Sequence, residues 1–299
     1  MSDKVLSIDN EVTWKLLATQ ANPPPGLDRL DTPRGALDRS FTFPDNAGEG
    51  VDVYVIDSGI DVNHADFGGR AQFLADFSGE GQSDLNGHGT HCASTAAGTR
   101  FGIAKQANVF AAKVFDASGS GSNFGVVQAL QTVARSVQQR GNPSVINMSL
   151  GGPRGGDAAT QRAIDSLVQL GAAVVVAAGN ESQDACNVSP AFIPSAITVA
   201  ANNPRDNRFA NFSNRGRCVD IIAPGVQIEA ARANSQSASA FLSGTSMASP
   251  HVAGIMAALM SQGLSRAQAQ QTLLSTAVPN VVIGAPAGTR NLLAQLPQV

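Results

Sequence analysis

The stretch GTSMASPHVAGIMAALM, residues 244–260, decides how the rest of the chain is interpreted. Its second half is small and apolar, which favours a buried helix, and a glycine turn precedes it. Ser246 is therefore predicted at the helix start, where free backbone N–H groups and the positive end of the helix dipole lie. Pro250 is expected near the first turn, where its missing N–H costs least.

A serine at this place has two interpretations. The first is an N-cap, whose hydroxyl satisfies a backbone N–H of the helix. The second is a nucleophile whose developing oxyanion is bound by the N-terminal amides. A nucleophilic serine needs a base, and the base needs a group that orients it, so the rest of the chain must decide between the two.

Composition limits the partners that this protein can have. The chain has 299 residues, of which 43% are hydrophobic, enough for a substantial core. The net charge is −3 and there is no run of Lys or Arg. We therefore expect that neither nucleic acid nor an anionic membrane is a partner. The longest apolar runs, such as residues 171–179, are too short to span a bilayer. No apolar signal segment follows residues 1–4, so we expect either an intracellular protein or one that begins after a removed export signal.

The three cysteines are Cys92, Cys186 and Cys218, without the spacing typical of a zinc site. Their odd number allows one disulfide and one free thiol, as in an exported protein. It equally allows three free thiols, as in a cytosolic one.

From residue 51 onward the pattern alternates between strands and helices. Near-continuous Val/Ile/Ala strands that alternate with helices predict an α/β fold with a mostly parallel central sheet and helices on both faces. Residues 18–25 end in a proline run and are predicted as a break in regular structure. Residues 26–31 are predicted to form a loop with paired acids. The predicted strands are 51–56, 107–115, 143–149, 172–178, 197–201 and 219–222, and the predicted helices are 87–98, 124–139, 157–170, 246–260 and 265–277.

Three further polar residues stand at strand ends or in the loops after them, where α/β sheets place their active sites. Asp57 follows an apolar run, His88 lies between two glycines, and Asn180 follows Gly179. Singly, each has a structural explanation: a turn or capping aspartate, a buried structural histidine and a turn asparagine with positive φ.

Together with Ser246 these residues have one chemical meaning. The serine Oγ attacks an acyl carbon and the histidine takes its proton. The aspartate fixes the tautomer and steadies the imidazolium, while the Asn amide and the serine N–H hold the oxyanion.

The chain resembles a subtilisin-family serine protease (a subtilase), and within that family the proteinase K and aqualysin branch. The resemblance extends from about residue 20 to the C-terminus, and Asp, His and Ser follow one another in the subtilisin order. Motifs at 26–31, 212–214 and 218–220, together with Cys92 after the histidine block, point to the branch. The five matching blocks are VIDSGI (55–60), NGHGTHCA (86–93), NMSLGG (147–152), AAGN (177–180) and GTSMASPHVAG (244–254).

The resemblance implies a subtilisin-like three-layer fold and a serine endopeptidase that works through an acyl-enzyme. Asp57, His88 and Ser246 match the triad, and Asn180 the oxyanion donor. Substrate is expected to lie as a strand between two edge segments. The pocket for the residue before the scissile bond has small, uncharged walls, which implies a preference for apolar or aromatic side chains; Glu181 biases this in a direction that the sequence does not give. The implied substrate-binding residues are Gly119, Ser120 and Gly121 on one edge, Ser149, Leu150 and Gly151 on the other, and Ala177, Ala178 and Gly179 in the pocket wall.

The resemblance also implies a Cys186–Cys218 disulfide, with Cys92 as a free thiol under the catalytic histidine. It further implies structural Ca²⁺, because oxygen-only ligand sets suit a hard cation. Thr32 and Ser40 depart from the family's N-terminal calcium loop, and the region 281–283 lacks the acid expected near the C-terminus. The implied calcium ligands are the Asp220 carboxylate with the Pro194 and Ala196 carbonyls, and separately Asp28, Asp31 and Asp38.

Residues 1–17 resemble a propeptide remnant or an N-terminal extension, and residues 18–299 form the peptidase domain. We expect maturation near Leu17–Ala18, the chain's own propeptide as a folding partner and inhibitor, polypeptide substrates, a monomer, and secretion. The alternatives are a catalytically inactive homologue that binds or inhibits, an intracellular regulatory protease with three free thiols, and an esterase that does not act on peptides.

Overall fold

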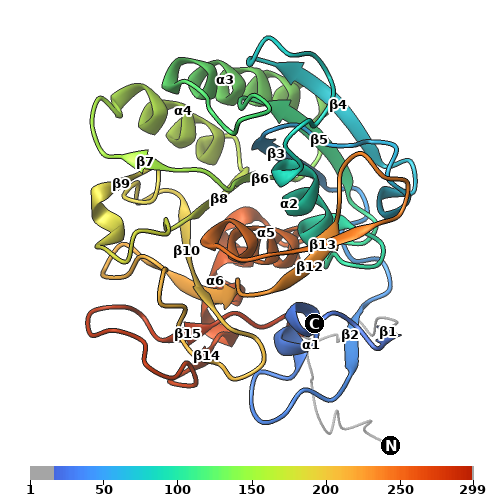
Figure 1. Ribbon diagram of the computed structural model, residues 1–299, viewed down its shortest axis with the longest axis vertical. Helices are drawn as coiled ribbons and strands as arrows, with labels where there is room; N and C mark the ends of the chain where they lie inside the picture. The colour runs from blue at the N-terminus through green and yellow to red at the C-terminus, as the bar shows by residue number, and fades with distance from the viewer. Residues whose placement is uncertain (1–16, 298–299) are drawn as a thin grey trace, which may run out of the picture.

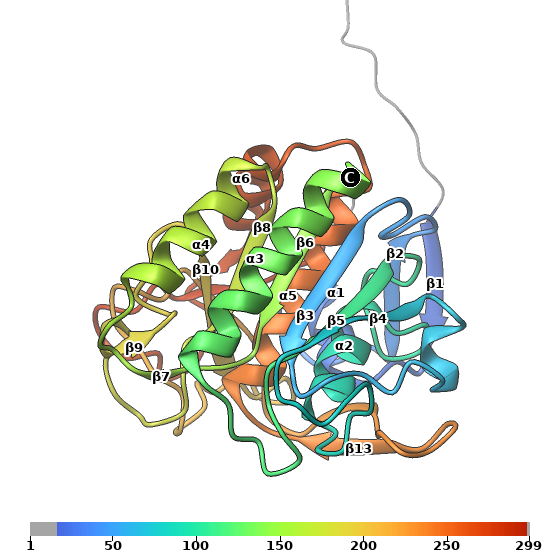
Figure 2. The ribbon, with the colours of Figure 1, turned by 90° about the horizontal axis from the view of Figure 1, so that it is seen from above.

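The computed structural model describes residues 17–297, which form three layers: a nine-stranded sheet between two layers of helices (Figures 1 and 2). Within this nine-stranded sheet all neighbouring strands are parallel, except for the edge pair Val278–Pro279 and Leu292–Leu293. The predicted α/β class with a mostly parallel sheet is thereby confirmed. In spatial order the strands are β14 (Val278–Pro279), β15 (Leu292–Leu293), β11 (Ile221–Pro224), β10 (Ile197–Asn202), β8 (Ala173–Ala177), β6 (Ser144–Met148), β3 (Asp52–Asp57), β5 (Asn108–Lys113) and β4 (Ala71–Asp76).

Side chains of the central strands alternate between two hydrophobic cores. In β3, Val53 and Val55 belong to one core and Tyr54 and Ile56 to the other. Successive side chains of a strand point to opposite faces, so an unbroken apolar strand fills both cores. Helices α2 (His88–Ala97) and α5 (Thr245–Met260) cover the first face, and α3 (Asn123–Arg140) and α4 (Ala158–Gln169) cover the second (Figure 2).

Helix α5 lies at the centre of the first core, against β6, β8, β10 and α2. Every residue of this helix except Ser246 is buried. A Cβ at Gly254 would lie 2.6 Å from the Ala96 carbonyl oxygen, so this glycine permits the close approach of α5 to α2. The apolar second half of the 244–260 stretch is therefore a buried helix, as predicted.

Pro250 differs from the prediction, because it lies inside α5 rather than in its first turn. A proline there leaves the carbonyl four residues earlier without a helical hydrogen bond. That carbonyl belongs to Ser246, and it accepts hydrogen bonds from Ser149 Oγ (2.7 Å) and Cys92 Sγ (3.3 Å) instead. The proline thus frees one backbone oxygen, which ties the helix start to two other segments.

The N-terminal region also differs from the prediction. Residues 26–31 are helical rather than a loop, since Pro25 occupies the first helical position, where its fixed φ suits a helix. Residues 18–21, predicted as a break, pair antiparallel with a strand that the sequence pattern did not indicate. The elements outside the main layers are β1 (Leu17–Ala21), α1 (Pro25–Asp31), β2 (Ser40–Pro44), β7 (Gly152–Pro153), β9 (Val188–Ser189), β12 (Ile228–Ala231), β13 (Ser239–Leu242), α6 (Arg266–Thr276) and the 3-10 helices Ala65–Phe67 and Ala185–Asn187.

Within the described residues, no helix has the length and apolar character needed to cross a bilayer. The predicted boundary between residues 17 and 18 falls at the first residues of β1. Residues 1–16 lie outside the described part, so the propeptide interpretation of residues 1–17 stays a prediction.

Candidate active site

The predicted site residues converge at the carboxyl ends of the central strands. Asp57 is the last residue of β3, His88 the first of α2, and Ser246 the second of α5, while Asn180 follows β8. They share a cavity of about 310 Å³. Its lining is Asp57, Ser58, Asn86, His88, Phe115, Gly119, Ser149, Leu150, Gly151, Ala177, Gly179, Asn180, Glu181, Thr245 and Ser246.

His88 and Asp57 form a short polar contact in this cavity. His88 Nδ1 lies 2.7 Å from Asp57 Oδ1, which also accepts the Ser58 N–H at 2.7 Å. The Asp57 side chain is fully buried and that of His88 is 30% exposed. Burial lowers the pKa of His88, but the Asp57 carboxylate and Cys92 together outweigh this, and the pKa is raised well above 6.5. Asp57 therefore orients the imidazole and makes its Nε2 a stronger base.

Ser246 Oγ donates a hydrogen bond to the Ser149 carbonyl at 3.3 Å, so its proton is not directed at His88 in this rotamer. In enzymes without substrate such catalytic hydrogen bonds are often long or unformed and tighten when the substrate binds.

Asn180 is oriented by the residue before the serine. Its Oδ1 accepts hydrogen bonds from the Thr245 N–H (2.8 Å) and the Thr245 hydroxyl (3.0 Å). Because the amide oxygen is engaged, Nδ2 is left as a donor beside the Ser246 N–H. Two fixed donors at a helix start can stabilise an oxyanion that forms on an acyl carbon attached to Ser246.

Cys92 lies beneath His88, as the resemblance implies, with its Sγ 3.9 Å from His88 Nδ1. It is a free, fully buried cysteine. Burial raises the pKa of the thiol, so it stays protonated. Asp57, His88 and Cys92 form the one group of three potential metal ligands found within reach of one another among the described residues, and Asp57 and His88 already pair there.

Most, but not all, of the predicted substrate residues line a groove. Gly121 lines a neighbouring cavity of about 210 Å³ that shares Phe115, Leu150 and Gly151 with the first. Ser120 and Ala178 line neither cavity: Ala178 is fully buried, and the Ser120 N–H binds Asp116.

The pocket wall after β8 contains a carboxylate. Glu181 Oε2 accepts a hydrogen bond from Asn214 Nδ2 at 2.6 Å, and its N–H donates to Asn214 Oδ1. Asn214 Nδ2 also donates to the Ala178 carbonyl. The Asn214 amide therefore holds Glu181 at the wall, where one carboxylate oxygen is already occupied.

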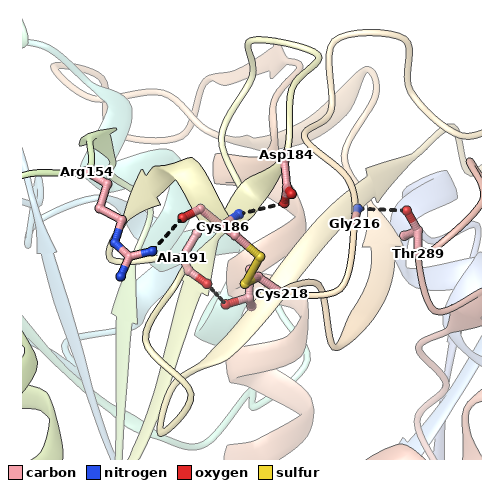
Figure 3. Close-up of a disulfide and its surroundings, with 8 residues drawn as sticks. Arg154, Asp184, Cys186, Ala191, Gly216, Cys218 and Thr289 are labelled. Carbon is pink, nitrogen blue, oxygen red and sulfur yellow. Dashed lines mark hydrogen bonds between the residues drawn. A yellow bond between two sulfur atoms is a disulfide. The ribbon is translucent and has the colours of Figure 1, made fainter.

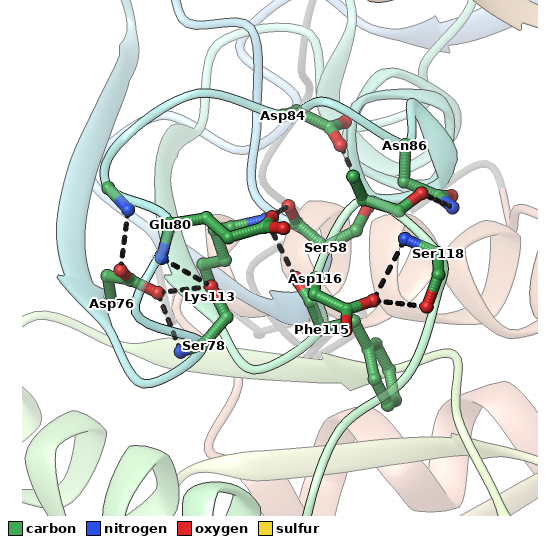
Figure 4. A network of polar contacts seen from close by, with 12 residues as sticks. Ser58, Asp76, Ser78, Glu80, Asp84, Asn86, Lys113, Phe115, Asp116 and Ser118 are labelled. Carbon is green, nitrogen blue, oxygen red and sulfur yellow. Dashed lines mark hydrogen bonds and ion pairs between the residues drawn. The ribbon is translucent and has the colours of Figure 1, made fainter.

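The sequence did not reveal Ser58 and Asp84, the polar residues that join the end of β3 to the start of α2 (Figure 4). Ser58 Oγ donates to the buried Asp84 (2.9 Å) and accepts the Gly89 N–H. Asp84 also accepts the N–H groups of Gly87 and Thr90, so it satisfies donors at the start of α2. The position of Asp84 four residues before His88 was the available signal, but one acid in a loop carries little information.

The Cys186–Cys218 disulfide is present, as the resemblance implies (Figure 3). It borders a cavity of about 630 Å³ that is also lined by Pro194, Asp220 and Arg290. Asp220 Oδ2 accepts the Thr198 N–H, and its Oδ1 lies 3.7 Å from the Arg290 guanidinium. A calcium ion at Asp220 has to displace that cation, so this ligand set fits the ion poorly.

Among the N-terminal acids, Asp31 offers the better cation ligand, although Asp28, Asp31 and Asp38 do not bring three ligand oxygens within 4.8 Å of one another. Asp31 Oδ1 is buried without a hydrogen-bond partner, while Oδ2 accepts the Thr42 N–H. Burial raises the pKa of Asp31 to about 6, and Asp28 and Asp38 add to this rise. Both Asp28 oxygens accept backbone N–H groups of residues 38 and 39, which closes the loop around these acids.

Comparison with known proteins agrees with the sequence motifs. A family model described as "Subtilase family" matches residues 48–295. Proteinase T of Parengyodontium album is 41% identical over 291 residues, which cover 96% of this chain and 97% of that protein. Subtilisin-like protease 2 of Pseudogymnoascus destructans is 43% identical over 288 residues, which cover 96% and 70% respectively. The crystal structure of a cold adapted subtilisin-like serine proteinase superposes with a TM-score of 0.85 at 41% identity, over 93% of this chain and 100% of that one.

Proposed function

Because this chain belongs to the subtilase family of serine peptidases, we propose that it is an endopeptidase in which Ser246 is the nucleophile, His88 the general base and Asp57 the orienting acid. The observation that carries the proposal is the 2.7 Å His88–Asp57 contact in a cavity that Ser246 and Asn180 also line. Ser246 Oγ attacks the peptide carbonyl while His88 takes its proton, and His88 then protonates the leaving amine. Water hydrolyses the acyl-enzyme by the same route in reverse.

Substrate is proposed to bind as an extended strand between the segment around Gly119 and the segment Ser149–Gly151. Gly119, Ser149, Leu150 and Gly151 line the cavity from its two sides, which suits a strand paired on both edges. Apolar or aromatic side chains are preferred before the scissile bond, because Ala177 and Gly179 give that pocket a small apolar wall. Glu181 adds a secondary tolerance for basic side chains.

Digestion of a defined peptide mixture tests activity and specificity together. We expect internal cleavage, mostly after Phe, Leu or Met and less often after Lys or Arg, as identified by mass spectrometry of the products. A fluorophosphonate is expected to label Ser246 stoichiometrically. Labelling together with ester hydrolysis but no peptide cleavage would favour the esterase alternative, and a protein that is not labelled would be an inactive homologue.

We also propose a calcium ion in the N-terminal loop, with Asp31 as a ligand alongside Asp28 and Asp38. The unpartnered, buried Asp31 Oδ1 supports it, because a buried carboxylate oxygen without a donor is costly and a hard cation would satisfy it. The Asp220 set with Pro194 and Ala196 stays a prediction of the resemblance.

Calcium is expected to raise the melting temperature of the Ser246→Ala protein, which cannot digest itself. At 100 times the dissociation constant the gain is about 2.7 kcal/mol, or roughly 2–4 °C per kcal/mol for a large domain. Asp31→Asn should remove most of this gain and leave stability in EDTA unchanged or higher, because it removes a buried charge. Asp206→Asn, at an acid 47% exposed, is the control and should keep the full gain. Equal calcium responses in all three proteins would contradict the site.

Secretion is proposed on the basis of the Cys186–Cys218 disulfide, since such bonds persist in oxidising compartments. Action as a monomer, and the chain's own propeptide as its partner, are proposed with it. Mass spectrometry before and after reduction and alkylation tests the disulfide in the protein from its natural source, where three free thiols would favour the intracellular alternative.

A further inference from the structure

Lys113, the last residue of β5, is a fully buried cation beside the active site (Figure 4). Its Nζ donates to the Ser58 carbonyl (2.8 Å) and the Phe115 carbonyl (2.7 Å). The third contact is Glu80 Oε2, at 3.4 Å. A buried ammonium costs several kcal/mol of desolvation, and an apolar residue of similar size is often no less stabilising. Stability alone therefore gives a weak reason for a lysine at this position.

The first carbonyl that Lys113 holds belongs to the residue that orients the catalytic acid. Ser58 N–H donates to the same Asp57 oxygen that contacts His88, and Ser58 Oγ bridges Asp84 and the Gly89 N–H. Asp57 and Lys113 are also direct neighbours in the parallel β3–β5 register. A shift of Ser58 would therefore move the Asp57 carboxylate relative to the imidazole.

The second carbonyl begins the segment proposed to bind substrate. Phe115 lines both the active-site cavity and the neighbouring one, and it forms an antiparallel bridge with Gly121. The turn between them is closed by Asp116, whose Oδ1 accepts the N–H groups of Ser118 and Ser120. These hydrogen bonds hold the turn together, so its placement depends on its base at Phe115.

Glu80 is the counterion and lies in a surface turn that a second aspartate holds. Asp76 Oδ1 accepts the Ser78 N–H and Oδ2 the Gly81 N–H, both at 2.7 Å, on either side of Glu80. Figure 4 shows Lys113 between this turn and the turn of Asp116 and Ser118.

We propose that Lys113 is a positioning residue that fixes the Asp57–Ser58 end of β3 and the substrate-binding segment 115–121 relative to each other, with Glu80 as its counterion. The proposal rests on the endopeptidase function proposed above. The Lys113 ammonium then couples the orientation of the Asp57 carboxylate to the position of the segment that pairs with the substrate.

Lys113→Met tests this with two substrates, a tetrapeptide p-nitroanilide that ends in Phe and a single-residue Phe anilide. We expect kcat to fall about tenfold on both substrates, because Asp57 loses its orientation. KM should rise about tenfold on the tetrapeptide alone, because only this substrate reaches segment 115–121. Glu80→Gln, at a 30% exposed side chain, should show the same pattern more weakly, and it decides the question if Lys113→Met does not fold.

Lys105→Met is the matched control. Lys105 Nζ donates to the Thr99 and Gly102 carbonyls and to Gln20, and none of these residues lines the cavity, so this variant loses a half-buried lysine that likewise binds two carbonyls. The Lys105→Met protein should lose stability without changing the ratio of tetrapeptide to single-residue kcat/KM.

If Lys113→Met and Glu80→Gln also leave that ratio and kcat unchanged, Lys113 is only structural and the proposal is wrong. An inactive wild-type protein would instead contradict the proposed function.

Discussion

Replacing Ser246 with alanine is expected to lower kcat by about 10⁶-fold on a tetrapeptide p-nitroanilide with Phe before the scissile bond, the magnitude found for the same loss in subtilisin. The alanine protein should still fold, because Ser246 Oγ makes one long hydrogen bond, to the Ser149 carbonyl. Its backbone N–H and the Asn180 amide remain, so KM should change little. Rates of p-nitroaniline release per mole of folded protein measure the effect, and the absence of fluorophosphonate labelling in the alanine protein excludes wild-type contamination.

A serine at the other end of the same helix provides the control. Ser261 Oγ accepts the Gly48 N–H and donates to the Ala258 carbonyl, far from the cavity. Ser261→Ala should cost some stability and leave kcat within about twofold. If Ser246→Ala kept a rate near that of Ser261→Ala, the nucleophile would be another group and the N-cap interpretation of Ser246 would regain its force.

The sheet could be predicted because its strands carry their own signal. Residues 144–148 and 173–177 form strands within one residue of the predicted ends, as expected for apolar runs buried on both faces. Strands β2 and β4 were missed because each lies on an edge and mixes polar with apolar residues. Helix α1 was missed because Gly26 and the prolines just before it are typical of a turn. The tertiary packing that favours a helix there cannot be seen in the sequence.

The residues of the site also differ in how much signal the sequence carries for them. Asp57, His88, Asn180 and Ser246 were found because each stands in a block of residues with a chemical meaning, and the structure brings all four to one cavity. Lys113 was not found, although one lysine inside the apolar run 109–115 was a visible anomaly. A sequence distinguishes a buried lysine from an exposed one only when its partners are known, and two of the three partners of Lys113, Ser58 and Glu80, come from other segments.

Asp57→Asn is expected to lower kcat/KM by about 10⁴-fold, the scale known for loss of the triad aspartate in serine proteases. Here Asp57 Oδ1 accepts a hydrogen bond from the Ser58 N–H and lies 2.7 Å from His88 Nδ1. The side-chain oxygen of an asparagine can make the same two contacts and so keep the imidazole in place. What is lost is the negative charge that steadies the imidazolium in the transition state. Much of the effect should therefore appear in kcat.

The pH profile separates this electrostatic loss from misfolding. The acid limb of kcat/KM reports the pKa of His88 in the free enzyme, because only the neutral imidazole accepts the serine proton. Asp57, with a smaller contribution from Cys92, raises that pKa well above 6.5 against the effect of burial, so the wild-type limb should have its midpoint above pH 6.5. Without the carboxylate, the strongest influence that raises the pKa is lost while burial still lowers it, so the limb of Asp57→Asn should move to lower pH. A limb that stays in place while the rate falls would show that Asp57 acts by geometry and not by charge.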